Sequence, residues 1–223
     1  INALIDGEAC LGWSCFPRFD GDPVFCRLLG PDGDDGFFAI ELDGRTTVEQ
    51  AYRENTALLE TVLRDGRGNG VRITDFCPRF EQFGRMFHPT TILRLVEPLG
   101  EAPRLRLRCR PVFAYGAQAP QRTRGSNHLR YVGDTGALRV STNAPLAYLL
   151  EETWFRLEEP VVLHLGADES IRSSLLPMAR DFLERTTAYW RQLSGRLHIP
   201  FEWQEAVMRS AITLKLCSHE DTG

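Results

Sequence analysis

The strongest constraint on the fold of this chain is an uninterrupted alternation of arginine with apolar residues over residues 104–110. The segment reads R-L-R-L-R-C-R, so in an extended backbone all four arginines lie on one face and the apolar side chains on the other. The segment is therefore predicted to be a β-strand with one buried face, and that face specifies its register against neighbouring strands.

From the start of the chain to about Gly166, apolar residues recur with a period of two, and Gly, Pro, Asn and Asp interrupt this pattern at short intervals. This pattern favours antiparallel strands over alternating strands and helices. Residues 56–64 and 71–76 are predicted to form a hairpin, because the segment between them reads D-G-R-G-N-G. Further strands are expected at residues 37–42, 91–98, 128–132, 137–142, 147–155 and 161–165. So many strands exceed one open sheet and predict two stacked sheets.

The apolar period changes after Gly166 to the spacing of an amphipathic helix. Residues 170–193 carry this spacing, Pro177 is expected in the first helical turn, and Gly195 provides a stop signal. A second helix is expected over residues 200–218. Its apolar face would hold Trp203, Val207, Ala211 and Leu214. Because such faces must be buried, the two helices are expected to pack against the strands or to cause self-association into a homo-oligomer.

Composition excludes several classes of partner. The 223 residues include 26 basic and 30 acidic side chains, and the net charge of -4 offers no general attraction to nucleic acid or to anionic membranes. No apolar stretch is long enough to span a bilayer, and no signal-peptide pattern follows Ile1. The six cysteines lack C-x-x-C spacing, so buried reduced thiols are expected rather than a disulfide or metal framework. Reduced thiols favour a cytoplasmic protein.

The charged motifs do not by themselves indicate a catalytic or metal site. Adjacent acidic residues at 34–35, 151–152, 158–159 and 220–221 are expected to be solvated, because neighbours on a strand point to opposite faces. The arginines of residues 104–110 are expected to meet cross-strand carboxylates rather than nucleic acid, since no aromatic residues are interleaved with them. The five histidines have no ligand spacing, so no metal is predicted.

Five motifs along the chain carry a resemblance to a known family. They read L-I-D-G at residues 4–7, G-W-S-C-F-P-R-F-D at 12–20, T-A-L-L-E-T at 56–61, T-D-F-C-P at 74–78 and P-V-F-A-Y-G at 111–116. In this order they resemble the N-terminal β-sandwich of bacterial glycoside hydrolase family 15, which includes glucoamylase-like and trehalase-like proteins. Residues 203–216 look like the first helix of that family's catalytic (α/α)6 barrel.

The resemblance implies a mainly β fold, an antiparallel β-sandwich of the super-sandwich type, followed by two helices that lead into a truncated (α/α)6 barrel. The implied division is a sandwich domain over residues 1–167, a linker helix over 168–198 and the first barrel helix over 199–223. In the family's order, the chain ends before the catalytic segments, so the catalytic residues are expected beyond residue 223.

The implied function is that of a non-catalytic N-terminal domain in an inverting α-glycosidase. Such an enzyme hydrolyses an α-glucosidic bond with two carboxylates and no cofactor. The implied partners are an α-glucoside, bound by the catalytic domain, and the chain's own C-terminal barrel. The alternative is a stand-alone carbohydrate-binding or interaction β-sandwich module, whose helices dock another chain. The two hypotheses differ over residues 203–216, which begin a barrel in the first and end a free domain in the second.

Four residues are the candidates for contact with substrate or with a second domain: Trp13, Arg18, Phe19 and Asp20. An aromatic ring can stack on a sugar, and Arg and Asp can hydrogen-bond to its hydroxyls. Alternatively, Arg18 and Asp20 brace a loop at a domain interface while Trp13 and Phe19 fill the core. Pro17 restricts the backbone here and favours a stiff loop. The bracing role is the expectation from sequence.

Overall fold

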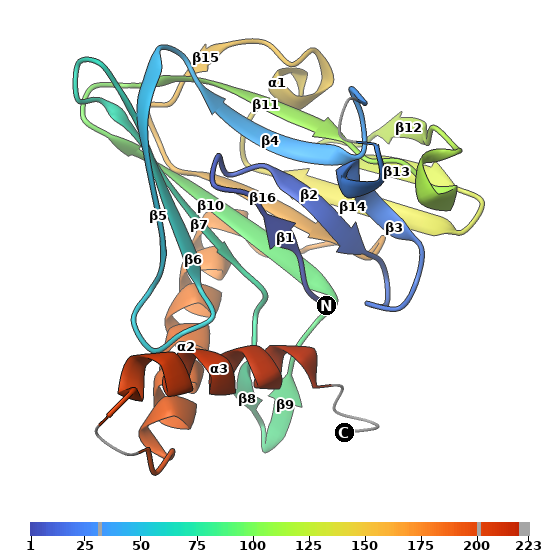
Figure 1. Ribbon diagram of the computed structural model, residues 1–223. Helices are drawn as coiled ribbons and strands as arrows, with labels where there is room; N and C mark the ends of the chain where they lie inside the picture. Colours follow the sequence, from blue (N-terminus) through green and yellow to red (C-terminus); the bar gives the residue numbers. More distant parts are fainter. Residues whose placement is uncertain (31–32, 200–201, 219–223) are drawn as a thin grey trace.

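The computed structural model describes residues 1–30, 33–199 and 202–218. Its strands form two antiparallel sheets that stack face to face, as Figure 1 shows, with their apolar faces turned toward each other. This architecture confirms the predicted mainly β fold built from stacked antiparallel sheets. The two longer helices lie outside the stack, one of them below the end of the sandwich (Figure 1).

The smaller sheet has six strands in the order β1-β2-β4-β11-β15, and β3 pairs with β2 beside this path. Its strands are β1 (Leu4–Ile5), β2 (Leu11–Cys15), β3 (Pro23–Cys26), β4 (Phe37–Leu42), β11 (Arg104–Arg110) and β15 (Phe155–Arg156). Two short 3-10 helices, η1 (Arg27–Leu29) and η2 (Ala114–Gly116), follow β3 and β11.

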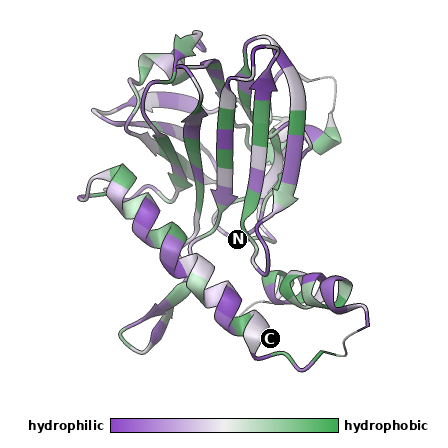
Figure 2. Cartoon of the chain, turned by 90° about the vertical axis from the view of Figure 1, so that its left-hand side faces the viewer, coloured by the Kyte–Doolittle hydropathy of each residue, from purple (hydrophilic) through white to green (hydrophobic). Residues whose placement is uncertain are grey.

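The larger sheet has eight strands in the order β12-β13-β14-β16-β10-β7-β6-β5. Its strands are β5 (Arg45–Tyr52), β6 (Leu59–Asp65), β7 (Gly70–Phe76), β10 (Thr91–Leu99), β12 (Gln121–Arg124), β13 (His128–Gly133), β14 (Gly136–Thr142) and β16 (Val161–Gly166). The predicted glycine-turned hairpin is β6 and β7. A separate hairpin joins β8 (Phe80–Gln82) to β9 (Arg85–Phe87). Hydrophobic and hydrophilic positions alternate along the strands that face the viewer in Figure 2.

The R-L-R-L-R-C-R segment forms β11, and its apolar side chains are buried between the sheets as predicted. Its arginines lie on the outer face, where Arg106 is in register with Glu41 of β4 and donates to its carboxylate at 2.8 Å. Aromatic rings also lie on this face, contrary to the expectation from the sequence. Arg106 packs over Trp154 and Arg108 over Phe37, because these rings come from the neighbouring strand β4 and from the residue directly before β15.

The long helix α2 (Leu175–Gly195) packs on the outer face of the larger sheet. With apolar side chains of β7, β10 and β16 it closes a second hydrophobic cluster, in which Trp190 is 1% exposed. Pro177 lies in the first turn, as predicted, but the helix begins at Leu175 rather than at residue 170. Proline is favoured in a first turn, where its absent N–H costs no hydrogen bond, and this explains the later start.

Helix α3 (Gln204–Cys217) packs through a different face from the one predicted. Ile212 is 1% exposed and joins the cluster around α2, whereas Trp203 and Leu214 are 79% and 71% exposed. The expectation that Trp203 and Leu214 belong to the packed face is therefore wrong. The apolar pattern allows two stripes on this helix, and only the contact with α2 and the sandwich selects between them. The predicted start at Pro200 lies outside the described residues.

The strand predicted over residues 147–155 is also wrong. Its first half is a single helical turn, α1 (Ala147–Leu150), and only its end joins a strand. Tyr148 stacks on Phe155 with ring centroids 4.0 Å apart, so the chain folds back on itself between them. Pro145 presets the backbone angle of a first helical turn just before this segment, which explains why a helix replaces the strand.

All six cysteines are free thiols, and four of them are buried. Burial raises the pKa of Cys109 to about 12 and that of Cys77 to about 11, so both thiols are protonated at neutral pH. Cys217 differs from the expectation of burial, because it is exposed at the end of α3.

Candidate functional site

Three of the four candidate residues lie together on the loop between β2 and β3. Arg18 and Asp20 form a bidentate ion pair within this loop, with the Arg18 Nε and Nη2 atoms each 2.9 Å from an Asp20 carboxylate oxygen. The backbone N–H of Gly21 donates to the Arg18 carbonyl at 3.1 Å and closes a turn. The two side chains are 69% and 50% exposed, so the pair shapes the loop but contributes little to global stability.

Asp22 anchors the end of this loop to the P-V-F-A-Y-G motif. Its carboxylate accepts hydrogen bonds from the backbone N–H groups of Ala114 at 2.6 Å and Tyr115 at 2.9 Å. Both donors have left-handed backbones, with φ of 51° and 54°, and successive N–H groups in a turn form a concave site for an anion. The Thr135 hydroxyl donates a third hydrogen bond at 2.9 Å. Asp22 therefore ties the loop to two other segments.

The aromatic candidates have different environments. Phe19 is 47% exposed, so it does not fill the core as the bracing hypothesis assumed. Trp13 lies within β2, half-buried and in register with Leu4 and Cys26 of the neighbouring strands. The structure therefore separates Trp13, which belongs to the sheet, from the exposed loop that holds the other three candidates.

A cleft of about 420 Å³ opens beside this loop at the end of the sandwich. Its walls are residues 17–19 of the loop, residues 77–79 and 88–90 around the β8-β9 hairpin, and residues 216–218 at the end of α3. The start of the chain and Trp190 of α2 also line it. Among the described residues of this lining, the polar side chains are those of Asn2, Arg18, Arg79, His88, Thr90 and Ser218.

Helix α2 holds Arg79 in position on one wall of this cleft. The Arg79 Nε donates to the Tyr189 hydroxyl at 3.1 Å, and its guanidinium carbon lies 5.5 Å from the centroid of the same ring. The backbone N–H of Arg79 donates to the Thr186 hydroxyl at 3.1 Å. Cys77 lies two residues away and remains a neutral thiol because burial raises its pKa to about 11. The polar chemistry of the cleft therefore comes mainly from guanidinium, imidazole and amide groups.

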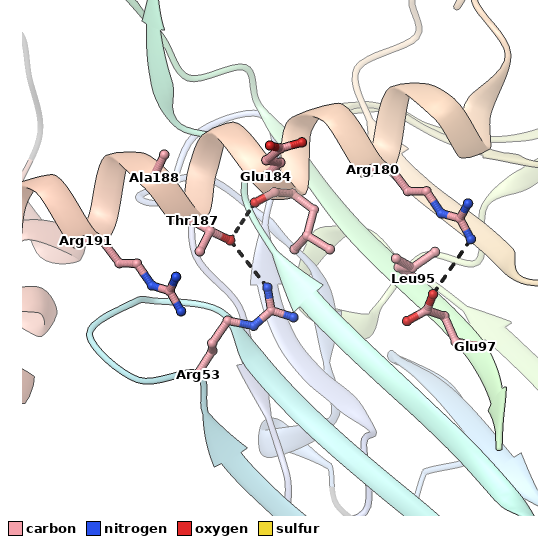
Figure 3. Close-up of a pocket in the computed structure, with 9 residues that line it drawn as sticks. Arg53, Leu95, Glu97, Arg180, Glu184, Thr187, Ala188 and Arg191 are labelled. Atoms are coloured by element: carbon pink, nitrogen blue, oxygen red, sulfur yellow. Dashed lines mark hydrogen bonds and ion pairs between the residues drawn. The ribbon is translucent and has the colours of Figure 1, made fainter.

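A second groove of about 570 Å³ runs between α2 and the larger sheet, as Figure 3 shows. Arg53 in this groove is paired with Glu60, with Nε 3.1 Å from the carboxylate, and its Nη1 donates to the Thr187 hydroxyl at 3.4 Å. Arg180 lies 3.9 Å from Glu97 across the groove. Three of its charged side chains are thus already paired, and its described lining contains no aromatic ring.

Asp34 and Glu152 both pair with arginine on the outer face of the smaller sheet. Asp34 is 77% exposed, as expected of a solvated side chain, whereas Glu152 is 18% exposed and differs from that expectation. Arg110 binds Asp34 and also donates through Nε to Glu152 at 2.6 Å. The hydrogen bond from Arg110 is the main cause of the lowered pKa of Asp34. Residues 158–159 are exposed as predicted, and residues 220–221 lie outside the described residues. Asp34 and Glu152 are thus both engaged by arginine side chains.

Within residues 1–30, 33–199 and 202–218, no three His, Cys, Asp or Glu side chains are grouped so that they could hold a metal ion. In the same part of the chain, no helix is long and apolar enough to cross a membrane. Of the five histidines, His88 lines the cleft and His219 lies outside the described residues.

The sequence did not point to Asn2, Arg79 or His88 as parts of one site. These residues come from the chain start and from both sides of the β8-β9 hairpin, so only the fold brings them together. The nearest signal was the T-D-F-C-P motif, which ends directly before Arg79.

Comparisons with known proteins relate the chain to trehalases. It is 27% identical over 233 residues to the trehalase of Thermoplasma volcanium, covering 99% of this chain and 36% of that protein. The trehalase of Thermoplasma acidophilum is 27% identical over 236 residues, covering 100% of this chain and 38% of that protein. "Trehalase 2" of Sulfolobus acidocaldarius is 28% identical over 116 residues, covering 52% of this chain and 18% of that protein. No solved structure matches the chain.

The chain spans a little over a third of the length of the Thermoplasma relatives. The family described as "Trehalase-like, N-terminal" matches residues 1–144, which hold the two stacked sheets up to β14. The chain therefore belongs to the trehalase-like N-terminal family.

Proposed function

We propose that this chain is the non-catalytic N-terminal domain of an inverting α-glycosidase of the glucoamylase or trehalase type. The parent enzyme would hydrolyse an α-glucosidic bond in carbohydrate metabolism, with trehalose as the first substrate to test. The observation that carries this proposal is the alignment of 99–100% of the chain with 36–38% of two trehalases. A cytoplasmic location is part of the proposal, because six free thiols suit a reducing compartment.

The proposed division places the sandwich at residues 1–167, a linker helix at 168–198 and the first helix of an (α/α)6 barrel at 199–223. The exposed stripe of α3 supports this division. Val207 and Leu214 on the helix are 41% and 71% exposed, and Trp203 directly before the helix is 79% exposed. Apolar side chains on one helix face are normally covered by another element. The chain's own barrel is the proposed cover, and an interaction module would instead present this stripe to another protein.

The catalytic carboxylates are proposed to lie beyond residue 223. An inverting glycosidase needs one carboxylic acid to protonate the leaving oxygen and one carboxylate to activate water on the opposite side of the sugar. Asp34 and Glu152 are instead held by arginines, and Asp22 by two backbone amides and a hydroxyl. Carboxylates that are ion-paired or hydrogen-bonded in this way are poorly suited to proton transfer.

The loop that carries Arg18, Phe19 and Asp20 is proposed to lie at the seam between sandwich and barrel. Its cleft is bordered by the end of α3, the helix proposed to begin the barrel. If Arg18 braces that seam, Arg18→Ala should lower the melting temperature of the complete protein. If Arg18 contacts sugar, the same substitution should change KM or kcat while the melting temperature hardly moves.

The test is hydrolysis by the complete gene product of trehalose, maltose and longer dextrins, followed by proton NMR of the first products. Inversion at one glucose of trehalose should release α- and β-glucose in equal initial amounts, because the leaving glucose keeps its configuration. Release of α-glucose alone would contradict inversion. Sugar binding without hydrolysis of any substrate would overturn the proposal in favour of a carbohydrate-binding module.

A further inference from the structure

We infer that the cleft beside residues 17–19 is a saccharide-binding site that the sandwich domain itself provides. The expected ligand is a neutral, hydroxyl-rich glucoside of one to three rings. The identity of the sugar rests on the proposed function, whereas the existence of the site rests on the geometry of the cleft. A volume of about 420 Å³ lies within the range that small-molecule sites occupy.

The first argument is the position of Phe19 at the cleft. This side chain is 47% exposed although it belongs to a sandwich whose other phenylalanines are mostly buried. An exposed ring beside polar groups gives a sugar an apolar surface for its C–H face, and covering the ring removes that surface from water. Phe83, at the tip of the β8-β9 hairpin, is 94% exposed but does not belong to the described lining of the cleft.

The second argument is the balance of charge and hydrogen-bonding groups. Two of the five N–H bonds of Arg18 serve Asp20, so this guanidinium keeps donors for a ligand while its charge is offset. Arg79 and His88 face the cleft from the hairpin side, and Asn2 adds an amide that can both donate and accept. The Arg18 charge is offset by Asp20, and the amide of Asn2 offers both a donor and an acceptor, a combination that suits the hydroxyls of a sugar.

The third argument is that the loop is held in one shape before any ligand binds. The turn from Arg18 to Gly21 is closed by a 3.1 Å backbone hydrogen bond, and Asp22 is anchored to Ala114 and Tyr115. Arg79, which also lines the cleft, is held by α2. Rigid placement of the binding groups reduces the entropy lost on binding.

The other large groove does not support the same inference. Its described lining between α2 and the larger sheet contains no aromatic ring. Arg53 donates there to Thr187, as Figure 3 shows, and is also paired with Glu60. A sugar would meet there several charged side chains and no aromatic ring on which to stack.

The experiment is titration of the purified 223-residue chain with trehalose, maltose and maltotriose, followed by isothermal calorimetry and ligand-observed NMR. At least one sugar should bind in the millimolar range, and Phe19→Ala should weaken that binding about tenfold, as expected for loss of about 1.4 kcal/mol of ring contact. Phe83→Ala is the matched control and should bind like wild type. Unchanged circular dichroism and melting temperatures of both variants show that they fold.

Absence of binding by the wild-type chain, or equal affinities of the two variants, would overturn the inference. Its failure is distinguishable from failure of the proposed function. Hydrolysis by the complete gene product together with no sugar binding by this chain would reject only the inferred saccharide-binding site. Sugar binding by this chain with no hydrolysis by the complete gene product would reject only the proposed glycosidase function.

Discussion

Arg94 and Asp75 form an ion pair whose side chains are 0% and 3% exposed between the two sheets. The Arg94 Nε lies 2.7 Å from Asp75 Oδ1, and its Nη1 donates to the Phe38 carbonyl at 2.8 Å. Arg94 and Asp75 belong to the larger sheet and Phe38 to the smaller one, so one guanidinium links both layers. Its Nη2 reaches the Ala9 carbonyl as well. The T-D-F-C-P motif thus supplies a charged contact inside the core.

Arg94→Met should lower the free energy of unfolding by about 3–5 kcal/mol, because it leaves the Asp75 carboxylate buried without its partner. The matched control is Arg104→Met, which removes an ion pair to Asp43 with both side chains about half exposed. That variant should lose less than about 1 kcal/mol. Urea unfolding of both variants measures the difference, and equal losses would contradict the structural role of the buried pair.

Acid should destabilise the sandwich through His164. Burial lowers the pKa of this histidine from 6.5 to about 4, so the unfolded chain takes up a proton at a higher pH than the folded chain does. Stability is therefore lost as the pH falls from about 6.5 toward 4. Between pH 7 and pH 5 the loss from this group should be about 1–2 kcal/mol. His164→Gln should remove that part of the pH dependence in urea unfolding, whereas the exposed His198→Gln should not.

Glu152 holds a left-handed backbone, with φ of 50°, while its carboxylate binds Arg108 and Arg110. Glu152→Ala removes the ion pairs and keeps the unfavourable backbone angle, whereas Glu152→Gly removes the ion pairs and relieves the angle. The glycine variant should therefore be more stable than the alanine variant by about 1 kcal/mol. Thermal unfolding of the pair tests this order, and a more stable alanine variant would refute it.

The two faces of α3 should respond differently to truncation. Ile212→Ala should lower the free energy of unfolding of the 223-residue chain by about 2–5 kcal/mol, since this side chain is 1% exposed. Leu214→Ala should change the same free energy by less than about 0.5 kcal/mol. In the complete protein, Leu214→Ala should also lower the free energy of unfolding, because the proposed barrel covers that face.

Light scattering of the 223-residue chain should show self-association, and Leu214→Ala should reduce it. A monodisperse monomer would count against an uncovered apolar stripe.

The parts of the fold that the sequence predicted are those with a buried face or a continuous apolar run. β11 alternates between buried and partly exposed positions, so its bounds and its buried face could be derived from the pattern alone, whereas β4 was recognised as an apolar run and is buried on both faces. β5 was not predicted, because most of its side chains are exposed at the edge of the larger sheet and little alternation remains. Residues 147–155 were misassigned because a short apolar run fits a strand or a helical turn equally well.

The candidate site was predictable only in part, for a related reason. The stiff loop with Arg18, Phe19 and Asp20 is contiguous in sequence and could be recognised there. Asp22 was missed because its partners at residues 114, 115 and 135 are distant along the chain. The orientation of α3 was missed because the contact with α2 and the sandwich determines which stripe is buried.

Glucose release from trehalose, measured for the purified 223-residue chain and for the complete gene product at equal molar concentration, separates the proposed roles of the two parts. The complete protein should release glucose, and the 223-residue chain should release none above the buffer control. Glucose release that copurifies with the 223-residue chain, and that is lost when the chain is unfolded, would contradict the proposal of a non-catalytic N-terminal domain.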